Sequence, residues 1–446
     1  MGRWNGHWTG PSLADIREVG SGASAERVRA HSSFFQLSRP AIIENDALPS
    51  LTNGVATVMK ALIRLPKILG DGDICRFWSL LEYDQAKQDL IAIGHRADMF
   101  GQLGRCDVFR DETGFKILEV NASSAIGGLN SRILADAYFQ DPQFTAYIKK
   151  IGLRWNDPAK HLVCMLQQKF PDIASGPVAI LDSPESYAIF KQMHDTLADV
   201  LTSYGMECFS GSLSDVVVHH GKASCMGRRF TAAYRVFQAR ELMSTPEKMK
   251  RWTWLLSDLE AAGIPVIIPL SSTSLSDKRS LALLQSKMVW HFLTPDEQDA
   301  VTRMLPRSII VGPNHSIEYH DHSKDWLHQM RNEIVLKPGI SSSSKGIIFG
   351  RDVTQETWEA LLASPPPGGY VAQQIVDPVP ELCPEKNGSE SVWQIQLGAF
   401  HLWGDVMVSN ARGMRAGLSG PMRSLYLGSD LPPADAALGS LTLVAS

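Results

Sequence analysis

The chain has 446 residues, of which 44% are hydrophobic and 20% charged, which is typical of a globular protein with two or three domains. Its 43 lysines and arginines against 47 aspartates and glutamates give a net charge of −4 and exclude a broad basic surface for nucleic acid. No apolar run approaches the roughly 20 residues of a membrane span, so neither nucleic acid nor a membrane is an expected partner.

The beginning of the chain and the cysteines indicate a cellular compartment. Residues 1–6 lack the apolar core of a signal peptide. The six cysteines are scattered without a Cys-x-x-Cys pair, which favours reduced thiols over disulfides or a zinc site. We therefore expect a cytoplasmic protein.

Residues 1–165 form the first expected unit. Apolar spacing predicts an amphipathic helix over 76–100. A β-hairpin follows, with strands over 105–109 and 115–120 joined by the turn sequence Asp111-Glu112-Thr113-Gly114. The hairpin is the most clearly delimited element of this unit.

Residues 175–275 form the second expected unit, in which strands and helices alternate. The predicted elements are a helix over 187–204 and short strands over 177–181, 205–209, 216–218, 232–237 and 266–268. Such alternation is typical of a parallel sheet covered by helices, which is an α/β arrangement.

Residues 276–446 form the third expected unit, which has α+β character. The predicted elements are helices over 279–292 and 354–362, strands over 308–311, 333–337, 346–349 and 370–375, and a β pair within 392–403. The expected fold class of the whole chain therefore combines α/β and α+β parts.

Polar side chains of the predicted hairpin share one face. Glu119 and Asn121 are two residues apart and point to the same side of their strand, and Asp107 on the paired strand can face them. Two carboxylates and an amide oxygen suit Mg²⁺, which then bridges phosphate oxygens. Arg105 shares the face of Asp107 and would contact phosphates or an acylated product. The alternative interpretation is an exposed polar hairpin face.

A lysine and small residues follow one another in the third unit. Lys337-Pro338-Gly339 leads into the run Ser341 to Ser344. Small residues let backbone N–H groups approach phosphate oxygens and a lysine adds charge, so Lys337, Ser342 and Ser343 are candidate nucleotide contacts. No helix is predicted directly after the serines, which separates the segment from a Walker A loop. An ordinary hairpin with a serine-rich tip is the alternative.

The strand over 370–375 has alternating polar positions. At the edge of a cleft, its backbone and the amide of Gln373 or Gln374 could seat an adenine ring. A plain strand fits the pattern equally well.

Two further patterns are not expected to bind a ligand. Residues 20–25 match the Gly-x-Gly-x-x-Ala form of a dinucleotide fingerprint, but no buried strand precedes them. The four histidines between 315 and 328 lack the spacing of metal ligands and are interpreted as part of a solvated loop.

Taken together and in this order, the segments resemble the circularly permuted ATP-grasp ligases, of which the glutathionylspermidine synthases are the best-known members. In most ATP-grasp enzymes the Glu-x-Asn strand follows the lysine loop, whereas here 116–121 precedes 335–338 by more than 200 residues. The Arg105-x-Asp107 pair, twelve residues ahead of Glu119, is similar to the synthase pattern.

This resemblance implies a circularly permuted ATP-grasp fold. A Rossmann-like pre-ATP-grasp domain over 175–275 would lie between a metal-binding half in 1–165 and an ATP-binding half in 276–446. The implied activity is an ATP-dependent carboxylate–amine ligase that uses ATP and Mg²⁺ and forms an amide through an acylphosphate. Its partners would be small-molecule or peptide carboxylates and amines, and a homodimer is compatible with the resemblance.

The resemblance also implies residue roles: Mg²⁺ ligands Asp107, Glu119 and Asn121, phosphate-binding lysines Lys278 and Lys337, and catalytic arginines Arg105 and Arg412. Lys278 is preferred over Lys287 because Asp277-Lys278 before a helix matches the family's Asn-Lys, with Asp in place of Asn. Arg415 is close enough in sequence to compete with Arg412.

Two departures from the family shape the expected function. The phosphate loop is rich in serine where the family has glycine, and no amidase domain is expected ahead of the ligase. A ligase without an amidase resembles peptide ligases of natural-product and antibiotic biosynthesis, the pheganomycin type among them, as much as polyamine conjugators. The alternative is an ATP-grasp scaffold that binds nucleotide or peptide without turnover.

Overall fold

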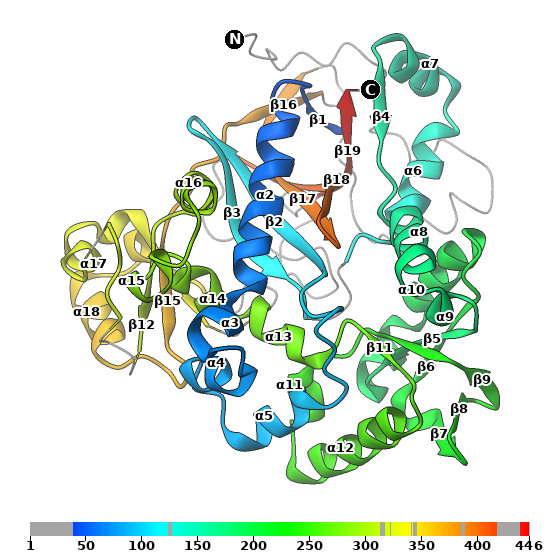
Figure 1. The fold of residues 1–446 in the computed structure, drawn as a ribbon. Coiled ribbons are helices and arrows are strands. Elements are labelled where there is room, and N and C mark those ends of the chain that lie inside the picture. Colours follow the sequence, from blue (N-terminus) through cyan, green and yellow to red (C-terminus); the bar gives the residue numbers. More distant parts are fainter. Residues whose placement is uncertain are drawn as a thin grey trace.

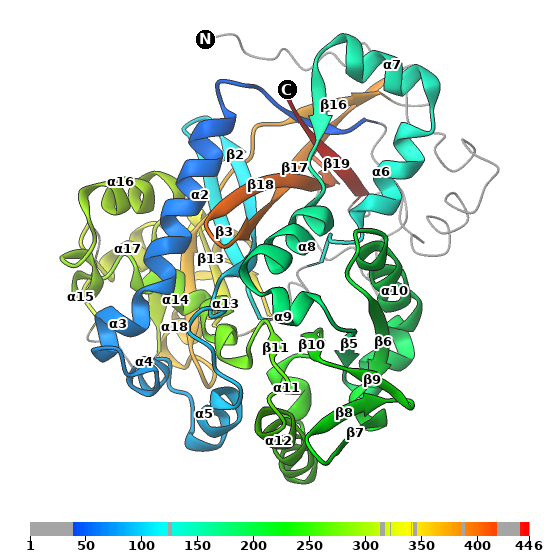
Figure 2. The same ribbon diagram turned by 45° about the vertical axis from the view of Figure 1, so that its right-hand side comes forward.

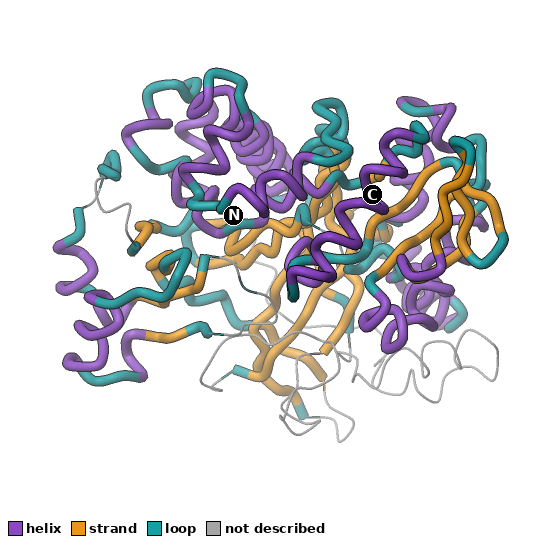
Figure 3. Tube along the Cα trace, turned by 90° about the horizontal axis from the view of Figure 1, so that it is seen from below, coloured by secondary structure: helices purple, strands orange, loops and turns teal. Residues whose placement is uncertain are grey.

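The computed structural model describes residues 39–123, 127–312, 317–321, 323–339, 341, 346–384, 389–416 and 438–445. These residues form a mixed α/β structure with four sheets, of eight, four, four and three strands (Figure 1). In the view from below, strands run through the middle of the molecule (Figure 3). No helix in the described part of the chain is both long and apolar enough to cross a membrane.

The largest sheet joins segments from both ends of the chain. Its main path is β1 (Ala41–Ile43), β19 (Leu438–Ala445), β18 (Asp405–Arg415), β17 (Glu390–Leu402), β2 (Leu103–Asp111) and β3 (Gly114–Asn121). β16 (Glu381–Pro384) pairs with β17, and β4 (Leu153–Trp155) pairs with β19. The predicted hairpin is confirmed as β2 and β3. The β pair expected within 392–403 is wrong, because this segment is one long strand whose partners are β18, β2 and β16.

Helices cover this sheet. α2 (Leu48–Ile63) lies across β3, β17 and β18 and packs beside α16 (Pro295–Met304) (Figure 1). The helix expected over 76–100 is two helices, α4 (Ile74–Leu80) and α5 (Gln85–Ala92). The break occurs because Glu82 adopts a left-handed conformation, with φ 55°, and Asp84 caps the next helix by accepting from the Lys87 N–H.

The central unit contains an entirely parallel four-stranded sheet. Its order is β11 (Val266–Ile267), β10 (Ala232–Arg235), β5 (Val178–Asp182) and β6 (Cys208–Ser212). α10 (Pro184–Ser203) connects β5 to β6, and the sheet lies beside α12 (Pro246–Ala261) in Figure 2. The strand expected over 216–218 belongs instead to a small antiparallel sheet of β7 (Val216–His219), β8 (Lys222–Cys225) and β9 (Arg228–Phe230).

The third sheet is antiparallel and carries the serine-rich segment. Its order is β12 (Ser308–Val311), β15 (Tyr370–Gln374), β13 (Ile334–Pro338) and β14 (Ile348–Phe349). The helix expected over 279–292 is two helices, α14 (Lys278–Leu283) and α15 (Lys287–Trp290). The helix breaks at Gln285 and Ser286 because their backbone pairs with residues 319–320.

The remaining α-helices are α3 (Leu65–Gly70), α6 (Ser131–Phe139), α7 (Pro142–Lys150), α8 (Pro158–Lys169), α9 (Pro171–Ala174), α11 (Ala239–Leu242), α13 (Thr273–Ser276), α17 (Asp325–Gln329) and α18 (Gln355–Ala363). α14 contacts β3 on one side and β12 and β15 on the other. It therefore places its first residue, Lys278, between two sheets. The domain boundaries expected from the sequence stay a prediction, although strands from 390–445 share a sheet with strands from 39–121.

A fully buried arginine fixes the connection that leads from the central sheet toward Lys278. Arg235 donates to the carbonyl oxygens of Ile268 at 2.6 Å and Phe237 at 2.8 Å. Ile268 has φ 63°, a left-handed conformation that a β-branched residue rarely adopts. These hydrogen bonds therefore hold a strained bend in place.

We expect Arg235→Met to lower the free energy of unfolding by about 2–4 kcal/mol, because it leaves buried carbonyl groups without donors. Urea unfolding measures this change. Arg228 pairs with Glu207 at the surface, so Arg228→Met is a matched control that should cost less than about 1 kcal/mol. Equal costs for the two variants would contradict a structural role for the buried guanidinium.

Candidate active site

A cleft of about 780 Å³ is lined by residues of the large sheet, the third sheet, the α13–α14 segment and the central unit. Nine of the residues predicted from the sequence line it: Arg105, Asp107, Glu119, Asn121, Lys278, Lys337, Gln373, Gln374 and Arg412. Ser341 lines it as well, whereas the predicted contacts Ser342 and Ser343 lie outside the described residues, as does the 20–25 segment.

The hairpin register brings its polar residues together. In the ladder between β2 and β3, Asp107 lies opposite Glu119 and Arg105 lies opposite Asn121. A bulge follows at once, because the register shifts between Asp107 and Val108. The four polar side chains therefore cluster at the open end of the hairpin, away from its turn.

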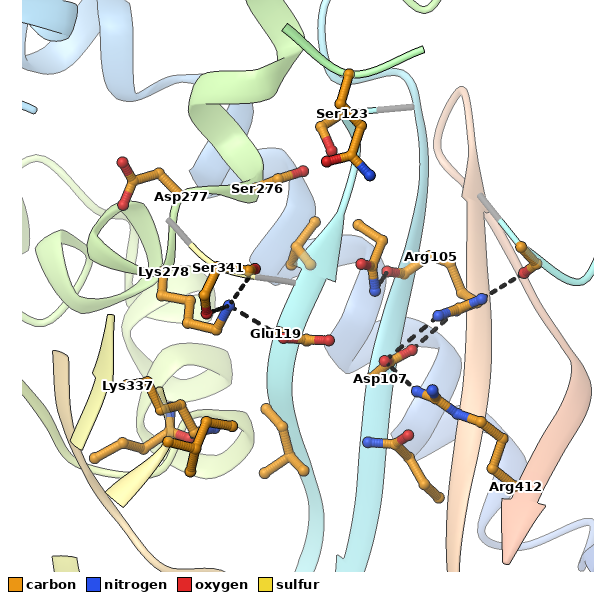
Figure 4. A pocket seen from close by; sticks show the side chains of 18 of the residues that line it. Arg105, Asp107, Glu119, Ser123, Ser276, Asp277, Lys278, Lys337, Ser341 and Arg412 are labelled. Atoms are coloured by element: carbon orange, nitrogen blue, oxygen red, sulfur yellow. Dashed lines mark hydrogen bonds and ion pairs between the residues drawn. The ribbon is translucent and has the colours of Figure 1, made fainter. Parts of the chain in front are cut away.

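Two arginines hold the buried Asp107. Arg105 Nε donates to Asp107 Oδ1 at 2.9 Å and Arg412 donates to Oδ2 at 2.6 Å (Figure 4). Burial alone would raise the pKa of Asp107, but the charges of the two arginines outweigh it and hold that pKa below its usual value. Asp107 is therefore an ionised carboxylate that orients both guanidinium groups.

The structure distinguishes Arg412 from its competitor. Arg412 lies on β18 opposite Gln396 of β17 and reaches Asp107 across the sheet. Arg415 is not among the residues that line the cleft, and its guanidinium lies over the ring of Trp393, 5.5 Å from the ring centre. Of the two, Arg412 is the arginine of this site.

Lys278 bridges the hairpin and the serine segment. Its Nζ lies 3.4 Å from Glu119 Oε2 and donates to the carbonyl of Ser341 at 3.2 Å (Figure 4). Its backbone N–H donates to the carbonyl of Gly339 at 3.0 Å. Lys287, by contrast, pairs with Glu318 and is half exposed. The structure therefore places Lys278 in the cleft and Lys287 on the surface.

Lys337 ends its strand inside the cleft. It donates to Gln373 Oε1 at 2.6 Å, and the Gln373 amide donates to Ser308 Oγ at 3.3 Å. Burial lowers the pKa of Lys337 to about 8, and the nearby charge of Lys278 adds to this effect while Glu119 opposes it. Gln373, which the sequence predicts as an adenine contact, thus positions a lysine in this state.

Sequence reasoning missed the cluster that supports Lys278. Asp277 caps α14 and forms two hydrogen bonds with the side chain of Arg279, at 2.7 and 3.0 Å. The hydroxyl of Tyr83 donates to the same carboxylate at 3.1 Å. The Asp-Lys-Arg sequence at a helix start was the available signal, but its tyrosine partner is 194 residues away in the chain.

The side-chain oxygen atoms at the hairpin are of the type that binds a hard cation such as Mg²⁺. Glu119 and Asn121 offer oxygen atoms at the cleft, and Glu119 is about one-third exposed. Asp107 accepts a hydrogen bond from Arg105 at one oxygen and from Arg412 at the other, and each oxygen keeps a lone pair for a cation. Within the described ranges, no three His, Cys, Asp or Glu side chains form a group that could hold a metal.

The assembled sheets form a fold that is similar to that of a solved glutathione synthetase-like protein. A glutathione synthetase-like effector from Globodera pallida in its apo form matches with a TM-score of 0.53 and 12% sequence identity, over 91% of this chain and 89% of that one. A putative gamma-glutamylcysteine synthetase from Methylobacillus flagellatus matches with a TM-score of 0.40 and 11% identity, over 83% and 84%. No protein-family model and no curated protein matches the sequence. At these identities the likeness establishes the fold alone.

Proposed function

We propose that this protein is an ATP-dependent carboxylate–amine ligase that forms an amide bond and releases ADP. The observation that supports it is the convergence of two lysines, a carboxylate–amide pair and two arginines in one cleft, from segments more than 200 residues apart. The ATP-grasp-type fold agrees with this activity. The order of the hairpin before the lysine strand supports a circularly permuted arrangement.

The proposed roles follow from charge and position. Lys278 and Lys337 would bind ATP phosphates, and Glu119 and Asn121, with Asp107, would hold Mg²⁺. Bound Mg²⁺ would neutralise charge on the transferred phosphoryl group. Arg105 and Arg412 would contact the acylphosphate and the oxyanion that develops when an amine attacks it. Asp107 keeps both guanidinium groups directed into the cleft.

The finer substrate assignment rests on the sequence resemblance. We propose that the enzyme joins an amino acid or small acid to a peptide or amine in a cytoplasmic natural-product pathway. The serine segment next to Lys337 would add phosphate contacts, and the adjoining backbone with Gln373 or Gln374 would seat the adenine. The competing proposal is a protein of the same fold that binds nucleotide or peptide without turnover.

Trapping with hydroxylamine tests the proposed activity. The protein is given ATP, Mg²⁺, hydroxylamine and the twenty amino acids one at a time, and ADP and hydroxamate are measured. An acylphosphate reacts with hydroxylamine, so hydroxamate and ADP should appear together with at least one acid. ATP binding without either product for every acid and amine tested would favour the non-catalytic alternative.

ATP binding should depend on pH through Lys337. Its pKa of about 8 means that the ammonium form is lost as the pH rises through this value, and a neutral amine attracts phosphate less. We expect ATP affinity to fall between pH 7 and pH 9.5, and calorimetry in two buffers should show proton uptake on binding near pH 8. Lys337→Arg stays charged over this range and should remove the dependence. An unchanged slope in this variant would contradict the assignment.

A further inference from the structure

The cleft continues beyond the residues assigned above, into the central unit. There it follows the carboxyl ends of two neighbouring parallel strands, β5 and β10, whose connections leave the sheet in opposite directions, to β6 and to β11. In open parallel sheets, ligands bind at such a switch point. We call this part the β5–β10 crevice, and its lining includes Asp182, Phe190, His194, Val236, Glu241 and Met243.

A buried pair of titratable residues lies in this crevice and has no role in the site described so far. His194 Nε2 lies 2.7 Å from Asp182 Oδ2, and each residue is only 2% exposed. The other carboxylate oxygen of Asp182 accepts from the backbone N–H of Ser183 at 2.8 Å. Asp182 ends β5 and His194 lies on α10, so two elements of the sheet layer hold the pair rigidly.

The hydrogen bond determines which ring nitrogen can accept a proton. An ionised carboxylate only accepts hydrogen bonds, so Nε2 of the neutral ring carries the proton and Nδ1 keeps its lone pair. Nδ1 is therefore the ring nitrogen that can accept a proton from a ligand. This is the arrangement of a histidine base that is oriented by an aspartate.

The charges around the pair favour a cation. Glu241 also lines the crevice, and its carboxylate accepts from Ser186 Oγ at 3.0 Å and from the Gln238 N–H at 2.8 Å. Two carboxylates therefore face the space, and Arg240, the one arginine that this unit contributes to the cleft lining, is exposed. An ammonium group is the complementary ligand.

The rest of the crevice wall is apolar. Phe190 and Met193 from α10 line it, as do Val236 and Met243 from the segment after β10. A ligand with a charged amine at one end and an apolar body would place both parts favourably.

We propose that the β5–β10 crevice binds the amine substrate, a primary amine with an apolar side chain such as an apolar amino acid or the start of a peptide. His194, oriented by Asp182, takes a proton from its ammonium group. The nitrogen lone pair then forms the C–N bond to the acyl carbon, the C–O bond to phosphate breaks, and phosphate leaves with that electron pair. The leaving phosphate takes the second proton from the nitrogen, which gives the neutral amide and hydrogen phosphate. This inference rests on the proposed ligase function for its acylphosphate.

Binding of blocked amino acids tests the crevice directly. The amides of valine, leucine, methionine and phenylalanine carry a free amine but no carboxylate. We expect at least one to bind the wild-type protein with Mg²⁺ and a non-hydrolysable ATP analogue present, by calorimetry. The same compound without its amine, for example 4-methylpentanamide for leucinamide, should bind at least tenfold more weakly. Failure of all four amides to bind would overturn the inference.

Variants of the pair separate a base from a structural contact. His194→Gln and Asp182→Asn should lower kcat for coupling of the amide at least 100-fold. Both should keep hydroxamate formation within a few-fold, because hydroxylamine is uncharged at neutral pH and needs no base. Equal losses with both nucleophiles would show a structural role and overturn the proposal. Absence of hydroxamate in the wild type would instead contradict the ligase function itself.

Two further variants keep the test decisive if the buried pair cannot be changed without unfolding. Phe190→Ala alters only the apolar wall and should raise the KM for the amide at least fivefold while hydroxamate formation stays unchanged. His161→Gln is the matched control for His194→Gln. His161 forms a second His–Asp pair, with Asp405 at 3.2 Å, and is not among the residues lining the cleft. An unchanged KM in Phe190→Ala would contradict the crevice as the amine site.

Discussion

Glu119→Gln is expected to reduce ADP release by roughly 100-fold or more while the protein stays folded. The change keeps the shape of the side chain and removes one negative charge from the oxygen donors that would face Mg²⁺. Glu119 is about one-third exposed, so little packing is lost and the unfolding temperature should change by only a few degrees. Steady-state ADP release and thermal unfolding measure the two effects separately.

The control for this variant lies in the same hairpin. Glu112 occupies the turn between β2 and β3, is exposed, and does not line the cleft. Glu112→Gln makes the same chemical change and should leave ADP release within about twofold, since surface substitutions of this kind have small effects. Near wild-type turnover in Glu119→Gln would remove the hairpin from the proposed site.

Lys337→Ala and Lys278→Ala are each expected to weaken ATP binding by roughly 10- to 100-fold. Each removes a charge-assisted contact that contributes about 1.5–3 kcal/mol. Lys278 also joins Glu119 to Ser341, so its loss should separate the hairpin from the serine segment as well. The dissociation constant of ATP, measured by calorimetry at pH 7, gives the result.

Lys287→Ala supplies the matched comparison. Lys287 pairs with Glu318 on the surface, so its replacement should change ATP affinity less than about twofold. If it weakened binding more than Lys278→Ala, the boundary at Asp277-Lys278 would be misplaced and the nucleotide would lie elsewhere.

The helices and strands could be predicted where residues typical of turns mark their ends. The hairpin was predictable because alternating residues flank an Asp-Glu-Thr-Gly turn, and the parallel strands because they are short and apolar. The helices predicted over 76–100 and 279–292 are too long. Apolar spacing continues through both breaks, although Asp84 caps a new helix at the first and Ser286 forms a β-bridge with Tyr319 at the second. Apolar spacing alone reveals neither the cap nor the bridge.

The site residues were predicted by type, but their contacts were not. The metal role expected for Asp107 stays a prediction, and its two arginine partners, one of them from β18 305 residues along the chain, were not foreseen. The adenine role expected for Gln373 stays a prediction as well, and its hydrogen bond with Lys337 was not foreseen. The His194–Asp182 pair was missed because its two residues belong to different elements and match no spacing rule. Such contacts depend on how strands align, which a single sequence does not encode locally.

The sheet that carries the hairpin also sets the order in which this chain can fold. β2 pairs with β17, so one edge of the hairpin stays unpaired until β17 is synthesised, almost 300 residues later. Until then, that edge presents unpaired N–H and C=O groups that can pair with another chain. Pairing over such sequence distances is slow and exposes intermediates to aggregation. The nascent chain should therefore depend on chaperones, and fragments ending before residue 390 should aggregate.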